Sequence, residues 1–353
     1  MGWSDHSTGG RVENLNYMMF GEAVSELTTN AHSELKTNIK VMGVGGAGCN
    51  IVSRIEEEDI PNVEIFAVNT DALCLHTLKV SNKNKILIGK NLTRGMGAAT
   101  PKIGEAAAKE SDKQLRDVIS NTDLLFLICG LGGGTGSGST PYIANIAKNL
   151  GIVTLVIATT PFNAEGKTRL ENAKHAIERL KKCADSLVLL PNERLMGFAR
   201  TLSLTAAYSL ISGIISMPIR SIAKVLTKKD LPHLREVLRD SGIALLGAGE
   251  AIGEYISVLT AEETIKGIWH AEDFPDISNV ERAVIFLTCS PDISIEEAKH
   301  AIKAVHKRIH PRAKIMWSYI INNEYKKKMS MVMLLSGLGH SGLEKSECFI
   351  KNP

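Results

Sequence analysis

The chain has 353 residues, of which 44% are hydrophobic and 22% charged, and its formal net charge is +3. This length is sufficient for two domains of ordinary size, and the composition is typical of a globular protein. A net charge so near zero argues against nucleic acid as a partner. No apolar run reaches the roughly 20 residues of a membrane-spanning helix, and the N-terminus lacks the apolar core of a signal peptide.

The cysteines are scattered and never occur as CxxC: Cys49, Cys74, Cys129, Cys183, Cys289 and Cys348. Several of them lie in apolar runs, which favours buried free thiols over disulfides or a zinc site. We therefore expect no metal site built from protein ligands, and a reducing, cytoplasmic environment.

The regular elements are expected to begin after an N-terminal extension. Residues 1–37 are mixed and polar with at most a weak helical pattern, so we expect a loosely attached segment. An apolar strand at 39–44 is followed by the loop Gly45-Gly46-Ala47-Gly48-Cys49-Asn50, after which a helix is expected to begin. A second strand at 63–68 ends in Asn69-Thr70-Asp71. Taken alone, this arrangement also fits the dinucleotide-binding fold of an NAD-dependent oxidoreductase.

A richer glycine loop follows: Gly130-Leu131-Gly132-Gly133-Gly134-Thr135-Gly136-Ser137-Gly138. It lies between an apolar strand at 124–129 and an expected helix with Pro141 in its first turn and Gly151 at its end. The backbone N–H groups of such a loop, together with the positive N-terminal end of a helix, form a cradle for phosphate. It is not a Walker P-loop, because no Gly-Lys-Ser/Thr follows. The alternative is a flexible linker, which the flanking strand and helix disfavour. A dinucleotide fold has no use for this second cradle.

Strands and helices alternate through the rest of the first half. The pattern predicts a small-residue loop at 92–101, a helix at 103–119, a strand at 152–158 with a polar loop at 159–169, a helix at 170–182, and a strand at 186–190 ending in Pro191-Asn192. This alternation predicts an α/β fold, with a parallel sheet covered by helices on both faces. Because the polar loops follow strand ends, they are expected to meet at one edge of the sheet, where α/β proteins bind ligands.

A long helix at 205–228 is apolar on more than one side, which predicts burial between two domains, and Pro218 predicts a kink in it. The pattern then becomes α+β, with strands at 242–247, 283–288, 313–321 and 329–335 and a helix that begins with a Ser294–Glu297 capping box. We therefore divide the chain into an extension (1–37), a nucleotide-binding domain (38–204), a central helix (205–228), a smaller α+β domain (229–338) and a polar tail (339–353).

Short motifs over roughly residues 38–338 occur in the order found in the FtsZ branch of the tubulin superfamily, which this chain resembles. They are GGAGCN at 45–50, NTDA at 69–72, TRGMGA at 93–98, GGGTGSG at 132–138, PFNAEG at 161–166 with Arg169, PNERL at 191–195 and PDI at 291–293. The resemblance is to a divergent prokaryotic member of archaeal type. It implies a tubulin/FtsZ-like fold with a parallel-sheet GTPase domain, a long central helix and a smaller α+β C-terminal domain.

The resemblance also implies a function. Members of the family bind GTP with Mg²⁺, polymerise head to tail and hydrolyse GTP at the joint between subunits. The implied task is cell division or a related cytoskeletal role, in the cytoplasm and at the division site. The implied partners are further copies of this chain and, where the cell has one, a second FtsZ-type homologue.

Site residues are carried over from the resemblance position by position. It implies that the phosphates are held by Gly45, Gly46, Ala47, Gly48, Cys49, Asn50, Gly132, Gly133, Gly134, Thr135, Gly136, Ser137 and Gly138, and that Ala98 and Ala99 close over the terminal phosphate. Glu165 and Arg169 are expected at the ribose and phosphate, and Asn192 at the base. Tyr208 occupies the position of a Phe that stacks on guanine, and its ring can do the same. For Glu165 and Arg169 the alternative is a surface ion pair at helix spacing.

Three departures from the family pattern bear on mechanism. The guanine-reading Asp is replaced by Ser212, which offers one hydroxyl where a carboxylate accepts two hydrogen bonds. In the loop at 227–234, which in the family catalyses for the neighbouring subunit, Asp230 keeps the first acid, while Lys228 replaces the Asn and His233 the second acid. The loop at 98–100 is one residue short before Pro101.

These departures leave two hypotheses open. In the first, the chain is a polymer-forming GTPase, slow because Asp230 and His233 form an altered catalytic pair; His233 is then a base, or else simply a solvated loop histidine. In the second, the chain is a divergent paralogue that binds nucleotide and co-assembles but scarcely hydrolyses it. Lys228 and Lys229 facing a neighbour's phosphates would favour the second.

Overall fold

The computed structural model describes residues 17–19, 36–194, 203–239, 241–269 and 276–337. Strands in this part form one 12-stranded sheet in the order β1-β11-β10-β12-β8-β7-β6-β5-β2-β3-β4, with β9 paired to β8. The strands are β1 Tyr17–Met19, β2 Ile39–Val44, β3 Val63–Asn69, β4 Lys85–Leu87, β5 Leu124–Gly130, β6 Val153–Thr160, β7 Ser186–Pro191, β8 Ile243–Ile252, β9 Ile268–Trp269, β10 Arg282–Cys289, β11 Lys314–Ile321 and β12 Lys328–Ser336.

The half of the sheet from β4 to β7 is parallel throughout. Ile39 of β2 is in register with Val63 of β3 on one side and Leu124 of β5 on the other. Strand β6 is buried along its whole length, as expected for a strand covered on both faces. The predicted α/β class with a parallel sheet is confirmed.

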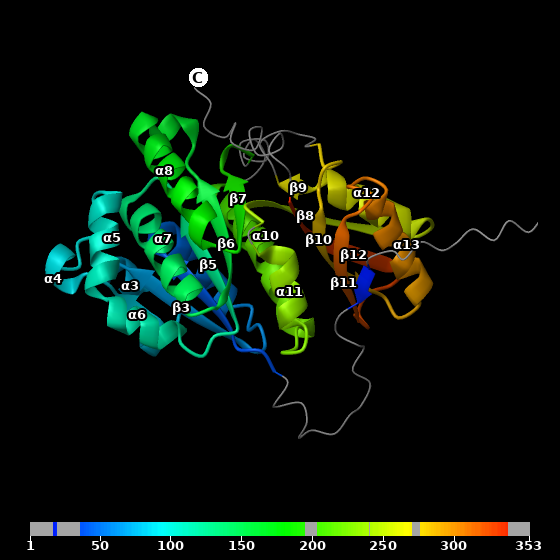
Figure 1. Ribbon diagram of the computed structural model, residues 1–353, viewed down its shortest axis with the longest axis horizontal. Helices are drawn as coiled ribbons and strands as arrows, with labels where there is room; N and C mark the ends of the chain where they lie inside the picture. The colour runs from blue at the N-terminus through cyan, green and yellow to red at the C-terminus, as the bar shows by residue number, and fades with distance from the viewer. Residues whose placement is uncertain (1–16, 20–35, 195–202, 240, 270–275, 338–353) are drawn as a thin grey trace, which may run out of the picture.

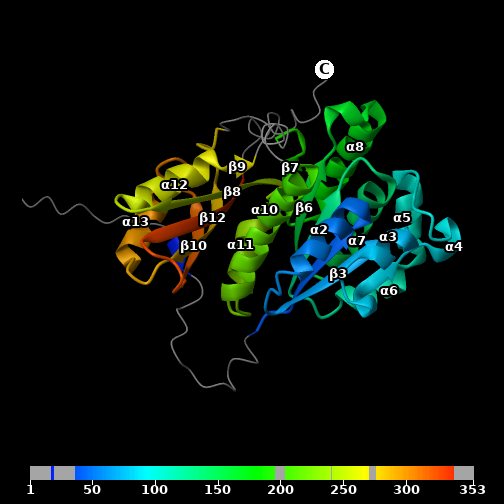
Figure 2. The same cartoon turned by 180° about the vertical axis from the view of Figure 1, so that it is seen from behind.

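Helices cover both faces of this half (Figures 1 and 2). The helices of the described part are α2 Gly45–Glu56, α3 Ala72–Thr77, α4 Lys90–Thr93, α5 Pro101–Glu110, α6 Asp112–Ile119, α7 Gly134–Asn149, α8 Lys167–Cys183, α10 Leu204–Val225, α11 Leu231–Leu238, α12 Ile256–Lys266 and α13 Ile295–His306. The last two, α12 and α13, pack on the other half of the sheet. Helices α5 to α8 bury apolar side chains in one core cluster, whereas α2, α10 and α11 bury theirs in a cluster on the opposite face.

Helix α10 lies between the two halves of the molecule (Figure 1). Its side chains Ile215, Ile219 and Ile222 are fully buried. They belong to the same core cluster as Val52 of α2 and Phe286 of β10. The predicted burial of the central helix between two domains is therefore confirmed, although the helix ends at Val225. Pro218 lies inside it, and the kink stays a prediction.

Two features of the second half were not predicted. Strand β8 pairs with β7, so that one sheet continues from the first half into the second. Strand β1 pairs with the edge strand β11, so Tyr17–Met19 are not loosely attached as expected for residues 1–37. The Ser294–Glu297 capping box at the start of α13 is confirmed, with both reciprocal hydrogen bonds present. The tail at 339–353 lies outside the described residues.

Two helices begin earlier than the pattern predicted. Helix α2 starts at Gly45, inside the first glycine loop, and α7 starts at Gly134, inside the second, with Pro141 in its interior. A Cβ on Gly48 would lie 2.2 Å from the carbonyl oxygen of Ile128, so this turn packs directly on β5. Apolar periodicity could not reveal these first turns, because glycine has no side chain to contribute to it.

The single helix predicted at 103–119 was also wrong. Ser111 leaves the helical region (φ −100°, ψ 18°) and separates α5 from α6. Its hydroxyl oxygen accepts a hydrogen bond from the N–H of Gly89 at 3.1 Å. A serine that bonds to a neighbouring segment competes with helix continuation, and this tertiary contact is absent from the sequence pattern.

The five cysteines in the described part are free thiols, and four of them are buried: Cys49, Cys129, Cys183 and Cys289. Burial raises the pKa of Cys183 to about 11, so its thiol is protonated and unreactive at neutral pH. Cys348 lies outside the described residues. No helix in the described ranges has both the length and the apolar character needed to cross a membrane.

A methyl group at Gly138 is expected to destabilise the fold. Its Cβ would lie 2.1 Å from the carbonyl oxygen of Pro101 and 2.7 Å from the nitrogen of Glu105. Gly138→Ala should push α7 away from α5, and overpacking of this kind costs about 1–3 kcal/mol. Gly133→Ala is the matched control, because a Cβ there meets nothing within 4 Å. In thermal denaturation, the unfolding midpoint of Gly138→Ala should be lower than that of the wild type, whereas that of Gly133→Ala should be unchanged. Equal midpoints for the two variants would contradict the close α5–α7 contact.

Candidate functional site

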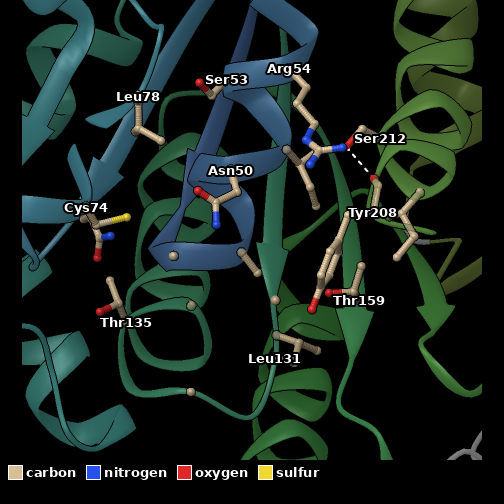
Figure 3. Close-up of a pocket in the computed structure, with 18 of the residues that line it drawn as sticks. Asn50, Ser53, Arg54, Cys74, Leu78, Leu131, Thr135, Thr159, Tyr208 and Ser212 are labelled. Carbon is tan, nitrogen blue, oxygen red and sulfur yellow. Dashed lines mark hydrogen bonds between the residues drawn. The ribbon is translucent and has the colours of Figure 1, made fainter. Parts of the chain in front are cut away.

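A cavity of about 1280 Å³ opens at the carboxyl edge of the parallel strands, between α2, α7 and α10 (Figure 3). Side chains from α2 and α10 face each other across it. The predicted residues that line it are Gly46, Ala47, Asn50, Ala98, Gly133, Gly134, Thr135, Gly136, Glu165, Arg169, Asn192, Tyr208 and Ser212. The structure thus brings together segments that are up to 166 residues apart in the sequence, from Gly46 to Ser212.

Ala99 is exposed and does not line the cavity. The other predicted loop residues that do not line it are buried: Gly45, Gly48, Cys49, Gly132, Ser137 and Gly138. The N–H of Gly132 already donates to the Ser137 hydroxyl oxygen at 2.8 Å, so it is not free for a ligand. The Cys49 thiol is buried against β2 and β3, which raises its pKa well above the usual range. These residues shape the cavity through packing rather than by facing it.

Helices α2 and α7 both point their N-terminal ends at the cavity. Neither has a side-chain cap, and neither has an acidic residue in its first turn. The first N–H groups of a helix have no acceptor inside the helix, and the helix dipole makes this end positive. The two ends are in contact, since a Cβ on Gly45 would lie 2.9 Å from the nitrogen of Gly136. This arrangement can bind an anion with several oxygens, such as a polyphosphate.

The loop that precedes α5 forms one side of this part of the cavity. It is attached to the end of β3 by two backbone bonds, from Gly97 N–H to the Thr70 oxygen (3.1 Å) and from Ala72 N–H to the Gly95 oxygen (3.0 Å). A Cβ on Gly134 would lie 2.0 Å from the Ala98 oxygen, so the loop packs on the first turn of α7. Ala98 lines the cavity and Ala99 does not.

Two observations on Glu165 and Arg169 bear on the interpretations that the sequence left open. They form an ion pair at i,i+4 spacing, and both also line the cavity. Glu165 Oε1 accepts the N–H of Phe162 at 2.8 Å, which fixes the carboxylate at the start of α8. A pair held in this way can meet hydroxyl and phosphate groups of a ligand while its own charges stay balanced.

The side of the cavity where α2 meets α10 is lined by Tyr208, Ser212 and Arg54. The Tyr208 side chain is 48% exposed, whereas Ser212 is 4% exposed and donates its hydroxyl proton to the Tyr208 carbonyl oxygen at 2.9 Å. Arg54 Nη1 donates to Ser209 Oγ at 2.6 Å. Sequence reasoning missed Arg54. Arg54 lies four residues after Asn50, so the two share one face of α2. A sequence prediction that began this helix at Gly45 would have placed Arg54 beside Asn50.

The candidate catalytic residues do not line the cavity of their own chain. Asp230 Oδ2 accepts two hydrogen bonds from Thr227, from N–H at 2.9 Å and from Oγ1 at 2.6 Å. His233 is exposed on α11. Because Tyr208 and Val225 of α10 are separated by roughly 25 Å at 1.5 Å per residue, this loop lies at the opposite end of the helix from the cavity.

The parallel sheet, the paired helix N-termini and the central helix define a nucleotide-binding fold of the tubulin type. Residues 38–200 match the Tubulin/FtsZ family, GTPase domain, and residues 242–339 match the FtsZ family, C-terminal domain. The chain belongs to the FtsZ family, as the sequence motifs predicted.

Curated archaeal relatives match most of the chain. Cell division protein FtsZ 1 of Pyrococcus furiosus is 39% identical over 86% of this chain and 82% of its own length. That of Archaeoglobus fulgidus is 36% identical over 90% of this chain and 87% of its own. Among solved structures, an empty FtsZ dimer from M. jannaschii has a TM-score of 0.77 and 34% identity, covering 89% of this chain and 93% of that one.

A side chain at Gly133 is expected to block the anion site without disturbing the fold. Gly133 lines the cavity with φ −83° and ψ 171°, which any residue can adopt, and a Cβ there meets nothing within 4 Å. Gly133→Val should keep the thermal midpoint and weaken binding of a nucleoside triphosphate by at least about tenfold, since it displaces phosphate from the N–H groups. Titration calorimetry with Mg²⁺ measures the affinity. Unchanged affinity in folded protein would contradict the assignment of the anion site.

Proposed function

We propose that the cavity binds GTP with Mg²⁺, with the triphosphate at the N-termini of α2 and α7 and the base against Tyr208. The observation that carries this proposal is the pair of uncapped helix N-termini at one cavity, in a chain of the FtsZ family. Asp71 lines the cavity near these ends and is the candidate protein carboxylate for Mg²⁺, which is otherwise held by the phosphates and water.

We further propose that the chain polymerises head to tail, as a cytoplasmic component of cell division. A protofilament structure of a more distant archaeal protein, CetZ2 from Haloferax volcanii, shares the fold at 21% identity and a TM-score of 0.71. In this chain two apolar side chains beside the cavity are strongly exposed. Leu73 (74% exposed) lies just after β3, and Met96 (83% exposed) lies in the loop before α5. Apolar side chains this exposed favour a protein contact at that end. Stacking would place the 227–230 loop of one subunit against the cavity of the next.

Hydrolysis is then completed by residues of the neighbouring subunit. Asp230 keeps Oδ1 for a water molecule while Thr227 holds Oδ2. His233 on the first turns of α11 is the candidate second group in place of an acid. A water-positioning base contributes about 10²- to 10⁴-fold in rate, so this altered pair should turn over slowly.

A second candidate function is nucleotide-dependent co-assembly without appreciable hydrolysis. It is favoured by the double hydrogen bond from Thr227, which makes Asp230 a capping group for its own loop. In that case the nucleotide regulates the contact between subunits, and its phosphates are bound across the joint by Lys228 and Lys229.

Phosphate release should rise more steeply than linearly with protein concentration, because each cavity needs a neighbour to complete it. The measurement is steady-state phosphate release from GTP with Mg²⁺ over a wide concentration range. His233→Ala should lower turnover without changing GTP affinity. The control His175→Ala, at an exposed histidine of α8, should change neither the turnover nor the GTP affinity. Near-zero release at all concentrations, with GTP still bound, would establish the second candidate function instead.

Restoring a carboxylate at Ser212 should sharpen the choice of guanine. Ser212→Asp supplies two acceptors for guanine N1–H and the 2-amino group, which should raise the preference for GTP over ATP by about tenfold or more. Arg54 lies beside this position and helps keep the new carboxylate ionised. The control is Ser212→Asn, because asparagine has the size of aspartate without its charge. It should not raise the preference for GTP over ATP. Equal effects of the two variants would refute this account of the base site.

A further inference from the structure

Arg54 supplies a cluster of hydrogen-bond donors at the base end of the cavity. Its guanidinium extends from α2 toward α10 (Figure 3), where it contacts Ser209. One donor is used on Ser209 Oγ at 2.6 Å, and a guanidinium has five N–H donors in all. Ser209 and Ser212 are three residues apart on α10, so the guanidinium lies within one helical turn of the Ser212 hydroxyl.

Ser212 is an acceptor at this place rather than a donor. Its hydroxyl proton is committed to the Tyr208 carbonyl oxygen at 2.9 Å, so only its lone pairs face a ligand. The base end therefore presents a donor from Arg54 next to an acceptor from Ser212. Asn192 adds a side-chain amide, which can donate or accept a hydrogen bond and therefore does not distinguish one purine base from another.

The carboxylates that line the neighbouring part of the cavity are already paired. Glu57 forms an ion pair with Lys79, and Glu58 forms one with Arg220 at 3.4 Å. Each of these carboxylates therefore already has a basic partner within the protein, with which an amino group of the base would have to compete. Because Ser212 also replaces the family's Asp, no unpaired carboxylate in the described part of this end is placed to read the 2-amino group of guanine.

A donor beside an acceptor matches the edge of a purine with an oxygen at C6. Such a base offers O6 as an acceptor next to N1–H as a donor. Adenine presents the reverse pattern, with a 6-amino donor next to the N1 acceptor, so both contacts would fail. A buried polar group left without its partner is the strongest source of discrimination between similar ligands.

We propose that this chain recognises 6-oxopurine nucleotides as a class, through Arg54 on O6 and Ser212 on N1–H, and does not read the 2-amino group. This proposal rests on the proposed GTP site. Arg54 is then a specificity-determining residue, and inosine triphosphate is accepted as readily as GTP while ATP is excluded.

The test measures the affinities of GTP, ITP and ATP for the full-length protein with Mg²⁺, by competition against a fluorescent GTP analogue. ITP should bind within about threefold of GTP, and ATP at least about 100-fold more weakly, as expected for two failed contacts, one of them to a charged donor. ITP binding more than tenfold more weakly than GTP would overturn the proposal, because some group must then read the 2-amino position. Absence of binding by GTP itself would instead refute the underlying site.

Arg54→Ala should reduce the preference for GTP over ATP by about tenfold or more, and should lower ITP and GTP affinity together. The control is Arg116→Ala, which removes an arginine of α6 that pairs with Asp112, and neither residue lines the cavity; its GTP-to-ATP ratio should equal that of the wild type. If Arg54→Ala does not fold, Arg54→Lys keeps the charge but loses the planar fork, and should give an intermediate ratio. Equal losses for all three nucleotides would make Arg54 a brace between helices and overturn the proposal.

Discussion

The structure depends on two helices that begin at or shortly after the ends of neighbouring strands: α2 follows β2 directly, and α7 follows β5 after the three residues Leu131-Gly132-Gly133. Strands β2 and β5 are adjacent and parallel, so α2 and α7 start from the same edge of the sheet. Both positive ends then point at one cavity without a cap. In the absence of an anion this concentrates unsatisfied N–H groups and partial positive charge, a local cost that only a ligand of the opposite charge offsets.

The glycines that permit this arrangement do two separate tasks. Gly48, Gly134, Gly136 and Gly138 allow backbone to pack on backbone, and a methyl group at any of them would collide with a carbonyl oxygen. Gly46 and Gly133 have open space where a Cβ would stand, and they border the cavity. Some glycines of such a motif are therefore required for close packing of the backbone, whereas others leave space in the cavity for a ligand. Only the second group affects binding without affecting stability.

Much of the fold could be predicted, because strands buried on both faces form continuous apolar runs and the capping box at Ser294 is a local signal. The starts of α2 and α7 could not, because glycines carry no periodicity. The β7–β8 pairing is a tertiary contact that the local pattern of either strand does not encode. Within the site, the loop residues on the cavity wall followed from family motifs, whereas Arg54 depended on the true start of α2. The two hydrogen bonds from Thr227 to Asp230 could not be predicted from the sequence, because both residues are common in polar loops with many possible partners.

Two of the three departures expected from the sequence, at Ser212 and in the 227–230 loop, lie toward opposite ends of α10. Near its start α10 is joined to α2 by Arg54 and Ser209, and beyond its end the chain is held by Thr37, whose hydroxyl donates to the Leu226 oxygen at 3.1 Å. Both ties lead to segments next to β2, the strand from which the first anion-binding helix begins. A change at the base end can therefore reach the 227–230 loop only by shifting a helix that is fastened at both ends to the nucleotide-binding half. Under the proposed function, a shift of this helix would therefore move the base end of the cavity and the 227–230 loop together.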